Sequence, residues 1–259
     1  MPRKLPLTVR RALAAVLSPF HVRIRSGPNQ GARWSLAAAG RHAAGSFEAE
    51  RMQLLRVLVR EGNVFWDVGA HHGYVTLLAS GLVGQDGRVY SFEPSGYNHY
   101  FLQRHVAMNR LCNVEVRKVG LGARNEVVSF GGGASSQALH VGGGRERVSL
   151  TTIPDLLRAG VPAPDVLKVD VEGSEADILE AGAQHLPGHC IAVIALHHRE
   201  ARDRSIAALV AAGFEVIESN KARYWAQHER WGEDPDIVAL GQDRRDLADK
   251  IRRLPAFSG

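Results

Sequence analysis

The chain has 259 residues with 45% hydrophobic side chains, which suits one α/β domain with a buried core and a short extension. No apolar run approaches the roughly 18 residues that a membrane-spanning helix needs. The two cysteines, Cys112 and Cys190, are too few for a disulfide framework. The composition therefore favours a reducing compartment, and we expect a cytoplasmic location.

The net charge of +5 is unevenly distributed. Residues 1–47 hold eight Lys or Arg and no Asp or Glu, which leaves 24 of the 32 basic residues and all 27 acidic residues to the remainder. We expect a basic N-terminal extension over 1–45, a main domain over 46–245 and a C-terminal tail over 246–259. The extension can contact an anionic partner or, peripherally, a membrane surface, or it can be a solvated, partly helical segment.

Hydrophobic periodicity and turn residues predict alternating helices and strands. In chain order we expect a helix over 47–60, a strand over 64–68, a helix over 74–80, a strand over 88–92, a helix over 97–109, a strand over 114–119, a helix over 151–159, a strand over 166–170, a helix over 176–181, a strand over 191–196, a helix over 205–212, and strands over 214–217 and 237–240. This alternation predicts a parallel, doubly wound sheet, with the last two strands as an antiparallel pair at one edge. The glycine-rich segment 131–144 is expected to be a flexible loop or a lid.

In open α/β sheets the ligand binds at the carboxyl ends of the strands. Five predicted strands end there in residues of functional type. These are Asp67, Gly69, Ala70, His71 and Gly73 after the first strand, Glu93 and Pro94 after the second, Gly120 after the third, Asp170 and Glu172 after the fourth, and His197 after the fifth. Their gathering at one edge of the sheet predicts a single site.

The pattern D-x-G-x-x-x-G over 67–73 and the later Glu93 indicate the kind of ligand. Glycines let the backbone approach a ligand closely, and the helix that follows offers free N–H groups. Glu93, 24 residues after Gly69, can accept hydrogen bonds from two ribose hydroxyls. Asp67 stands where a dinucleotide site has its first glycine, which argues against NAD. It suits S-adenosylmethionine, whose ammonium group Asp67 would help to hold.

The chain resembles the FkbM-type S-adenosylmethionine-dependent methyltransferases over about residues 45–218. The resemblance is carried by F-W-D-V-G-A-H-H-G-Y from Phe65, S-F-E-P from Ser91 and L-K-V-D-V-E-G-S-E from Leu167. It implies an α/β fold of the Rossmann-like class I methyltransferase type, with a doubly wound, mostly parallel seven-stranded sheet and a C-terminal antiparallel hairpin. It also implies methyl transfer to a hydroxyl oxygen of a small molecule or sugar. The family usually has Asn where His71 stands, and Glu where Ala195 stands.

We therefore expect S-adenosyl-L-methionine as cofactor. The residues expected to bind it are Asp67, Gly69, Ala70, His71, Gly73, Glu93, Pro94, Gly120 and Asp170. The expected partner is a small-molecule hydroxyl acceptor, and the sequence does not identify it further.

A hydroxyl acceptor must also lose its proton to a base or a metal-bound group. The expected catalytic residues are Asp170, Glu172 and His197. His197 is the preferred base because imidazole titrates near neutral pH, and Asp170 is its competitor. The three could instead bind Mg²⁺, although the sequence favours a site without metal. Asp170 and Glu172 alternate along the strand, so their side chains should start on opposite faces.

Ser174 and Asp177 form a capping-box pattern at the start of the helix that follows the fourth strand. This pattern makes Glu175 a first-turn carboxylate, stabilised by the helix dipole, with a structural role.

Two other classes of function stay open. The basic extension would suit a nucleic-acid methyltransferase, and the same fold also serves protein methyltransferases. The Asn/Asp-Pro-Pro-aromatic motif expected for methylation of a base amino group is absent, because Asp170-Val-Glu-Gly stands in its place. Nucleic acid is therefore not expected as a partner. The other class is a non-catalytic nucleotide-binding module, for example one that binds a nicotinamide cofactor.

Overall fold

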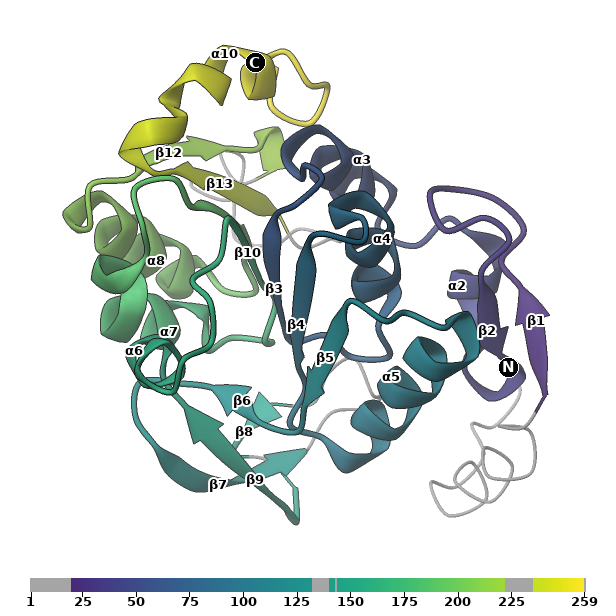
Figure 1. Ribbon diagram of the computed structural model, residues 1–259. Coiled ribbons are helices and arrows are strands. Elements are labelled where there is room, and N and C mark those ends of the chain that lie inside the picture. Colours follow the sequence, from purple (N-terminus) through teal and green to yellow (C-terminus); the bar gives the residue numbers. More distant parts are fainter. Residues whose placement is uncertain (1–19, 132–139, 143, 222–234, 259) are drawn as a thin grey trace.

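The computed structural model describes residues 20–131, 140–142, 144–221 and 235–258 (Figure 1). Its main element is a seven-stranded sheet in the order β12-β13-β11-β10-β3-β4-β5. The strands are β3 (Val64–Val68), β4 (Arg88–Phe92), β5 (Val114–Arg117), β10 (Val166–Val169), β11 (Ile191–Ala195), β12 (Glu215–Glu218) and β13 (Asp236–Leu240).

The strand order confirms the predicted class I methyltransferase fold. From the central β3 the chain proceeds to β4 and β5 on one side and then to β10 and β11 on the other, with all these pairs parallel. This reversal makes the carboxyl ends of β3 and β10 the place where such sheets bind ligands. The predicted antiparallel pairing of the last two strands is also confirmed. However, β13 lies inside the sheet between β11 and β12, so β12 alone forms the edge at this end of the sheet.

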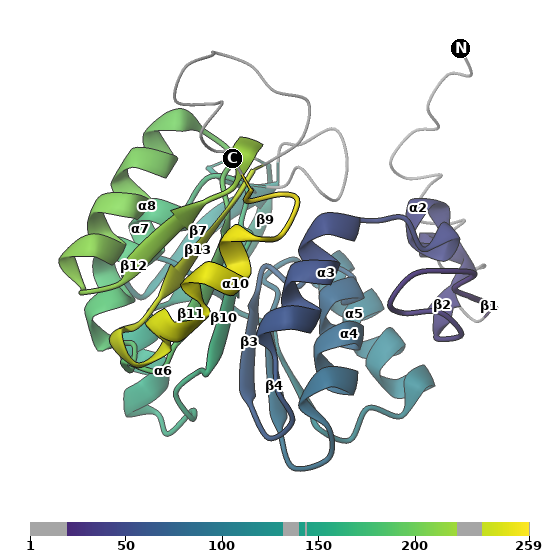
Figure 2. The same cartoon turned by 90° about the horizontal axis from the view of Figure 1, so that it is seen from above.

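Helices cover both faces of the sheet (Figure 2). One face carries α3 (Ala49–Leu58), α4 (Tyr74–Val83) and α5 (Gly96–Asn109), and the other carries α6 (Ile153–Arg158), α7 (Glu175–Gly182) and α8 (Arg199–Ala211). Side chains alternate between the faces, so Phe65 packs in the core cluster with α3 and α4 whereas Trp66 packs in the cluster with α6 and α7. Burial on both faces explains the nearly continuous apolar runs of β10 and β11.

The segment that precedes α3 is folded onto the domain. It contains β1 (His21–Arg23), β2 (Arg33–Ser35), a 3₁₀ helix η1 (Leu36–Ala38) and α2 (Gly40–Ala44). Trp34 is fully buried and stacks on His105 of α5, with ring centroids 3.7 Å apart. The prediction of a solvated extension is therefore wrong for residues 20–45, because Trp34 and Ile24 contribute to the core. Residues 1–19, with half of the basic side chains of this segment, lie outside the described residues.

A second, four-stranded sheet lies beside the main one and appears at the bottom of Figure 1. Its order is β6-β9-β7-β8, formed by β6 (Gly120–Leu121), β7 (Glu126–Gly131), β8 (His140–Val141) and β9 (Glu146–Thr151). The strand predicted over 114–119 ends earlier, at Arg117, and the small sheet begins at Gly120. Most of the predicted glycine-rich loop lies outside the described residues, at 132–139 and 143.

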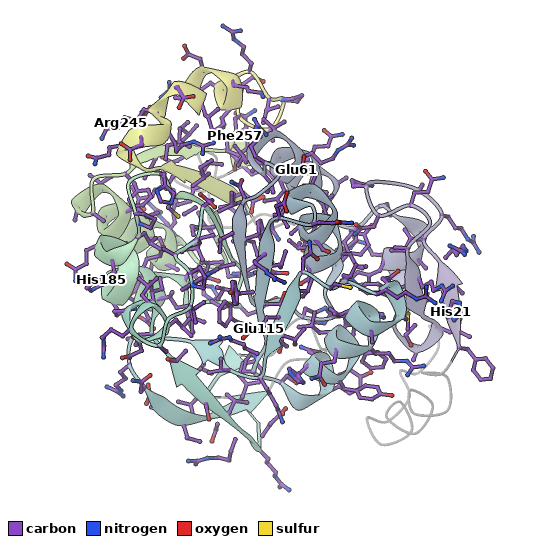
Figure 3. All side chains as sticks on the ribbon, in the orientation of Figure 1. His21, Glu61, Glu115, His185, Arg245 and Phe257 are labelled. Carbon is purple, nitrogen blue, oxygen red and sulfur yellow. The ribbon has the colours of Figure 1, made fainter. Side chains whose placement is uncertain are left out.

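The C-terminal segment also packs on the domain. The last strand, β13, is followed by η3 (Gln242–Leu247) and α10 (Ala248–Arg252). A further short 3₁₀ helix, η2 (Ala183–His185), follows α7 earlier in the chain. Ile251 and Phe257, the latter labelled in Figure 3, are buried in the same core cluster as α3. Residues 246–258 are thus part of the folded domain. None of the helices in the described part of the chain is long and apolar enough to cross a membrane.

Candidate functional site

A cavity of about 520 Å³ opens at the carboxyl ends of β3, β4 and β10. Its walls come from the β3–α4 and β4–α5 turns, the small sheet, the β10–α7 turn, and residues 41–51 of the N-terminal segment. The predicted site residues that line it are Gly69, Ala70, His71, Glu93, Pro94, Gly120, Asp170 and Glu172. Asp67, Gly73 and His197 do not line it.

The β3–α4 turn forms one wall with its backbone. Gly69 has φ +76°, and a Cβ at this position would lie 1.8 Å from the carbonyl oxygen of Asp170, so only glycine fits between the two turns. His71 also adopts a left-handed conformation, with φ +50°. At Gly73, a Cβ would lie 2.6 Å from the side chain of Leu102. Gly73 does not line the cavity, and its positive φ of +87° at the start of α4 favours glycine there.

Glu93 lies at the end of β4 and is held in place by the neighbouring turns. Its carboxylate accepts hydrogen bonds from the backbone N–H groups of His71 (2.8 Å) and Ser95 (3.0 Å) and from the side chain of Asn98 (3.4 Å). Burial raises the pKa of Glu93 to about 7, against these hydrogen bonds, which lower it. The carboxylate thus joins both turns and is presented to the cavity.

Asp67, which the sequence analysis expected to contact the cofactor, does not line the cavity. Its side chain is fully buried and accepts a hydrogen bond from Thr76 (2.7 Å). It also forms an ion pair with Lys168, 3.1 Å away. Asp67 and Lys168 are neighbours in register on β3 and β10 and lie on the same face of the sheet. Asp67 therefore contacts the site through Lys168.

Lys168 was missed by the sequence analysis and connects the turns around the cavity. Its ammonium group donates to the carbonyl oxygen of Gly69 at 2.9 Å and lies 3.7 Å from the carboxylate of Asp170. Burial lowers the pKa of Lys168, but the charges of Asp67, Asp170 and Glu48 raise it above its ordinary value overall. Lys168 therefore stays charged and fixes the β3–α4 turn against the end of β10.

Asp170, Glu172 and His197 lie together at the ends of β10 and β11. His197 Nε2 is 3.4 Å from Asp170 Oδ1 and 3.6 Å from Glu172 Oε2. Asp170 and Glu172 come to the same side, because β10 ends at Val169 and the turn that follows, with Glu172 at φ +60°, brings Glu172 round to Asp170 and His197. The three predicted catalytic residues thus form one cluster at the cavity.

Glu175 is the residue that holds this cluster. It is fully buried, and its Oε1 accepts hydrogen bonds from His197 Nδ1 (2.7 Å) and from the backbone N–H groups of Val171 (3.2 Å) and Gly173 (3.1 Å). The predicted capping box is wrong, since the side chain of Ser174 makes no capping hydrogen bond and Asp177 pairs with Arg204. Glu175 thus orients the imidazole of His197.

Arg51 closes the cavity from the N-terminal side and was also missed. It is buried in α3 and forms ion pairs with Glu48 (3.0 Å), Asp170 (2.7 Å) and Asp236 (2.8 Å). Asp236 begins β13 directly opposite Ala195, the position where the family usually has Glu. A carboxylate therefore does stand beside Ala195, supplied by the neighbouring strand.

Histidines gather beside the β3–α4 turn, and two of them, His42 and His71, line the cavity. His71 stacks on His72 with ring centroids 3.8 Å apart, and His42 stacks on Trp34 at 5.1 Å. Burial, with a contribution from neighbouring positive charges, lowers the pKa of His42 to about 4, that of His71 to about 3 and that of His105 to about 4. These imidazoles are therefore neutral in the folded protein at pH 7.

These histidines predict a loss of stability in acid. Each binds a proton more weakly in the folded chain than in the unfolded one, where the pKa is 6.5, so stability is complete above pH 6.5 and falls toward pH 4. Each histidine contributes up to about 1.4 kcal/mol per pH unit to this fall. We expect His42→Phe to reduce the slope of unfolding free energy against pH between 6.5 and 4.5, measured by urea unfolding.

The matched control is His185→Phe, at an exposed position labelled in Figure 3. This control should keep the slope of the original protein. An unchanged slope in His42→Phe would contradict the assignment of the acid sensitivity to this buried group.

Comparison with known proteins identifies the family. The sequence profile of the methyltransferase FkbM domain matches residues 67–231, more than half of the 259 residues. A comparison with curated proteins finds no match.

Several solved structures are similar to the chain at low identity. Precorrin-6y C5,15-methyltransferase from Geobacter metallireducens is 15% identical, with a TM-score of 0.49 over 74% of this chain and 87% of that chain. The FkbM methyltransferase from Methylobacillus flagellatus is 18% identical, with a TM-score of 0.49 over 73% of this chain and 50% of that chain. Fibrillarin from Aeropyrum pernix, with bound S-adenosyl-L-methionine, is 19% identical, with a TM-score of 0.48 over 73% of each chain.

The profile match includes the β3–α4 turn, Glu93 and the β10–α7 turn, which are the segments that build the cavity. The chain belongs to the FkbM family of S-adenosylmethionine-dependent methyltransferases.

Proposed function

We propose that this methyltransferase transfers the methyl group of S-adenosylmethionine to a hydroxyl oxygen of a small molecule or sugar. The observation that carries the proposal is the position of the Asp170–Glu172–His197 cluster. It adjoins the same cavity that Glu93 and the β3–α4 turn line. A group able to remove a proton therefore adjoins the donor site, and a hydroxyl acceptor needs such a group whereas a free amine does not.

The donor would occupy the half of the cavity formed by the two turns and the small sheet. Glu93 offers a carboxylate for the ribose hydroxyls, and Gly69 and Ala70 offer backbone that a ligand can approach closely. Leu121 and Leu150 add an apolar surface suited to the adenine ring. Charge on Asp170, which stays ionised beside Lys168, would favour the positively charged methionine end of the donor.

The acceptor would occupy the other half, between the β10–α7 turn and residues 41–51. This wall presents Arg41, Phe47 and Lys221 together with Glu172. A cavity of about 520 Å³ lies within the usual range for small-molecule sites, roughly 300–1,000 Å³. This size supports a small acceptor over a macromolecular one. The reaction itself is an in-line displacement, so the chief task of these residues is to align the hydroxyl with the methyl group.

The test is methyl transfer from donor carrying a ¹³C-labelled methyl group. The full chain is incubated with pools of hydroxylated compounds, with matched pools in which an amine replaces the hydroxyl, and with RNA and protein fractions. We expect labelled methyl ethers, recognised by the carbon chemical shift of an O-methyl group, from the small hydroxylated compounds. Label on nitrogen or carbon, or label found in RNA or protein, would overturn the proposal.

A further inference from the structure

We propose that Asp170, Glu172 and His197 form a binding site for a divalent cation of the Mg²⁺ or Mn²⁺ class, facing the acceptor side of the cavity. One ligand atom from each residue lies within 4.8 Å of the other two. Among the described residues this is the place where three such side chains come together. The inference deepens the proposed hydroxyl methylation, on which its catalytic role rests.

The hydrogen bond to Glu175 makes His197 a prepared ligand. A neutral imidazole has a single N–H, and here Nδ1 donates it to the buried carboxylate of Glu175 at 2.7 Å. The Nε2 lone pair is then directed toward the carboxylate oxygens of Asp170 and Glu172. A carboxylate behind a ligating histidine is the usual arrangement in metal sites, where it fixes the tautomer and raises ligand basicity.

A positive charge next to Nε2 would stabilise this arrangement. A lone pair that faces two carboxylate oxygens is repelled by them, and either a proton on Nε2 or a metal ion between the groups would relieve the repulsion. The distances are longer than a direct hydrogen bond to either carboxylate. A charge-assisted N–H···O bond measures about 2.7–2.9 Å, as the Glu175 contact does, whereas Nε2 is 3.4 Å from Asp170 and 3.6 Å from Glu172. Ligands at about 2.0–2.1 Å from an octahedral Mg²⁺ lie roughly 3 Å apart, so these side chains would need to move by only about half an ångström to hold an ion.

The ion pairs of Asp170 leave one of its oxygens to the proposed ion. Arg51 and Lys168 both approach Oδ2, at 2.7 Å and 3.7 Å, whereas Oδ1 faces His197. Carboxyl groups also outnumber these two cations in the network. They are Glu48, Asp67, Asp170, Glu172, Glu175 and Asp236. Even without Glu48, whose pKa burial raises, five carboxylates face two cations among the described residues of this network, so a divalent ion would reduce the net charge from −3 to −1.

A bound ion would explain how the acceptor is activated. Coordination of a hydroxyl to a divalent ion lowers the pKa of that hydroxyl, so its proton passes to solvent or to a nearby carboxylate. An oxygen lone pair then forms the new O–CH₃ bond while the S–CH₃ bond breaks. The bonding electrons stay on sulfur, so the sulfonium becomes the neutral thioether of S-adenosylhomocysteine. His197 would act as a metal ligand in this scheme, in place of the base predicted from sequence.

The test is Mn²⁺ binding to the full chain after removal of divalent ions with a chelator. Free Mn²⁺ is followed by electron paramagnetic resonance during titration. We expect saturable binding of one ion, weakened at least about 100-fold in Glu172→Gln and in His197→Asn, and about 10- to 100-fold in Glu175→Gln. The control Asp177→Asn changes a half-exposed carboxylate on α7, the helix that also holds Glu175, and should bind Mn²⁺ as tightly as the original chain does. Melting temperatures confirm that each variant is folded.

Absence of saturable Mn²⁺ binding, or equal binding by the folded Glu172→Gln and His197→Asn variants, would overturn the proposed site. Donor binding is measured separately by calorimetry in chelator, so failure of the metal site is distinguished from failure of the proposed function. Methyl-ether formation that continues at full rate in chelator would overturn the catalytic role of the ion and leave hydroxyl methylation standing. Metal binding without any methyl-ether product would instead count against the proposed function.

Discussion

We expect Glu93→Gln to weaken S-adenosylmethionine binding by about 100-fold, because two charge-assisted hydrogen bonds to ribose hydroxyls contribute about 3 kcal/mol together. Glu93 lines the cavity and is held by backbone donors from His71 and Ser95, so its carboxylate is already oriented when the ligand arrives. The substitution keeps the shape of the side chain and removes its charge. Isothermal titration calorimetry of the full chain measures the effect.

The pH dependence of binding gives a sharper version of this prediction. Burial raises the pKa of Glu93 to about 7, so the carboxylate becomes protonated as the pH falls from 8 to 6. Donor affinity should therefore fall over this range, by up to about tenfold per pH unit. The Glu93→Gln variant should lack this dependence, since its amide does not titrate. Affinity that is equally pH-dependent in both proteins would contradict the assignment of Glu93.

The stability of the variant should change little, which separates binding from folding. A buried carboxyl group whose pKa is raised from 4.5 to about 7 destabilises the fold as the pH rises through this interval, by roughly 3 kcal/mol at pH 8. Glutamine removes this cost but points an N–H group at one of the backbone donors, which costs about 1–3 kcal/mol. Glu115→Gln, on β5 and labelled in Figure 3, is an exposed control that should leave donor affinity unchanged.

The central sheet could be predicted from sequence because each of its strands is a short apolar run between turn residues. The strands at 64–68 and 88–92 were predicted with the bounds that the structure shows, since short apolar runs end there in turn residues. The carboxyl ends of parallel strands lie at the same edge of a sheet, and Glu93 after β4 and Asp170 after β10 do line one cavity. Position 71 carried a further signal: its φ of +50° suits Asn, the usual residue of the family, and His is also enriched in this conformation.

The residues that sequence analysis missed are those whose partners lie far along the chain. Lys168 reads as one polar residue in a buried strand, and only the β3–β10 register shows that it meets Asp67. Glu175 has the local signature of a helix first turn, and only the fold brings His197 to it. For Asp67, the sequence shows its position in the motif but not that its side chain pairs with Lys168. Contacts of this kind have no periodic or motif signal.

Arg51 belongs to this group, and its replacement should have the largest effect on stability. We expect Arg51→Met to lower the free energy of unfolding by about 3 kcal/mol, because removing one partner of a buried ion pair leaves uncompensated charge. Arg51 is 6% exposed and contacts carboxylates from three elements, so Glu48, Asp170 and Asp236 would repel one another without it. For a domain of this size, the melting temperature should fall by roughly 6–12 °C in calorimetry.

Two further variants show whether the charge network causes this loss. Arg56→Met, one turn later in α3 at an exposed position, keeps the helix and should melt near the original temperature. Arg51→Met combined with Asp236→Asn removes one of the repelling charges and should regain part of the stability. If Arg51→Met were as stable as the original chain, α3 would be held by its apolar contacts alone. If the double variant regained nothing, the loss would come from packing of the Arg51 side chain. Partial recovery is expected because the network joins α3 to the ends of β10 and β13, where the cavity needs its walls fixed.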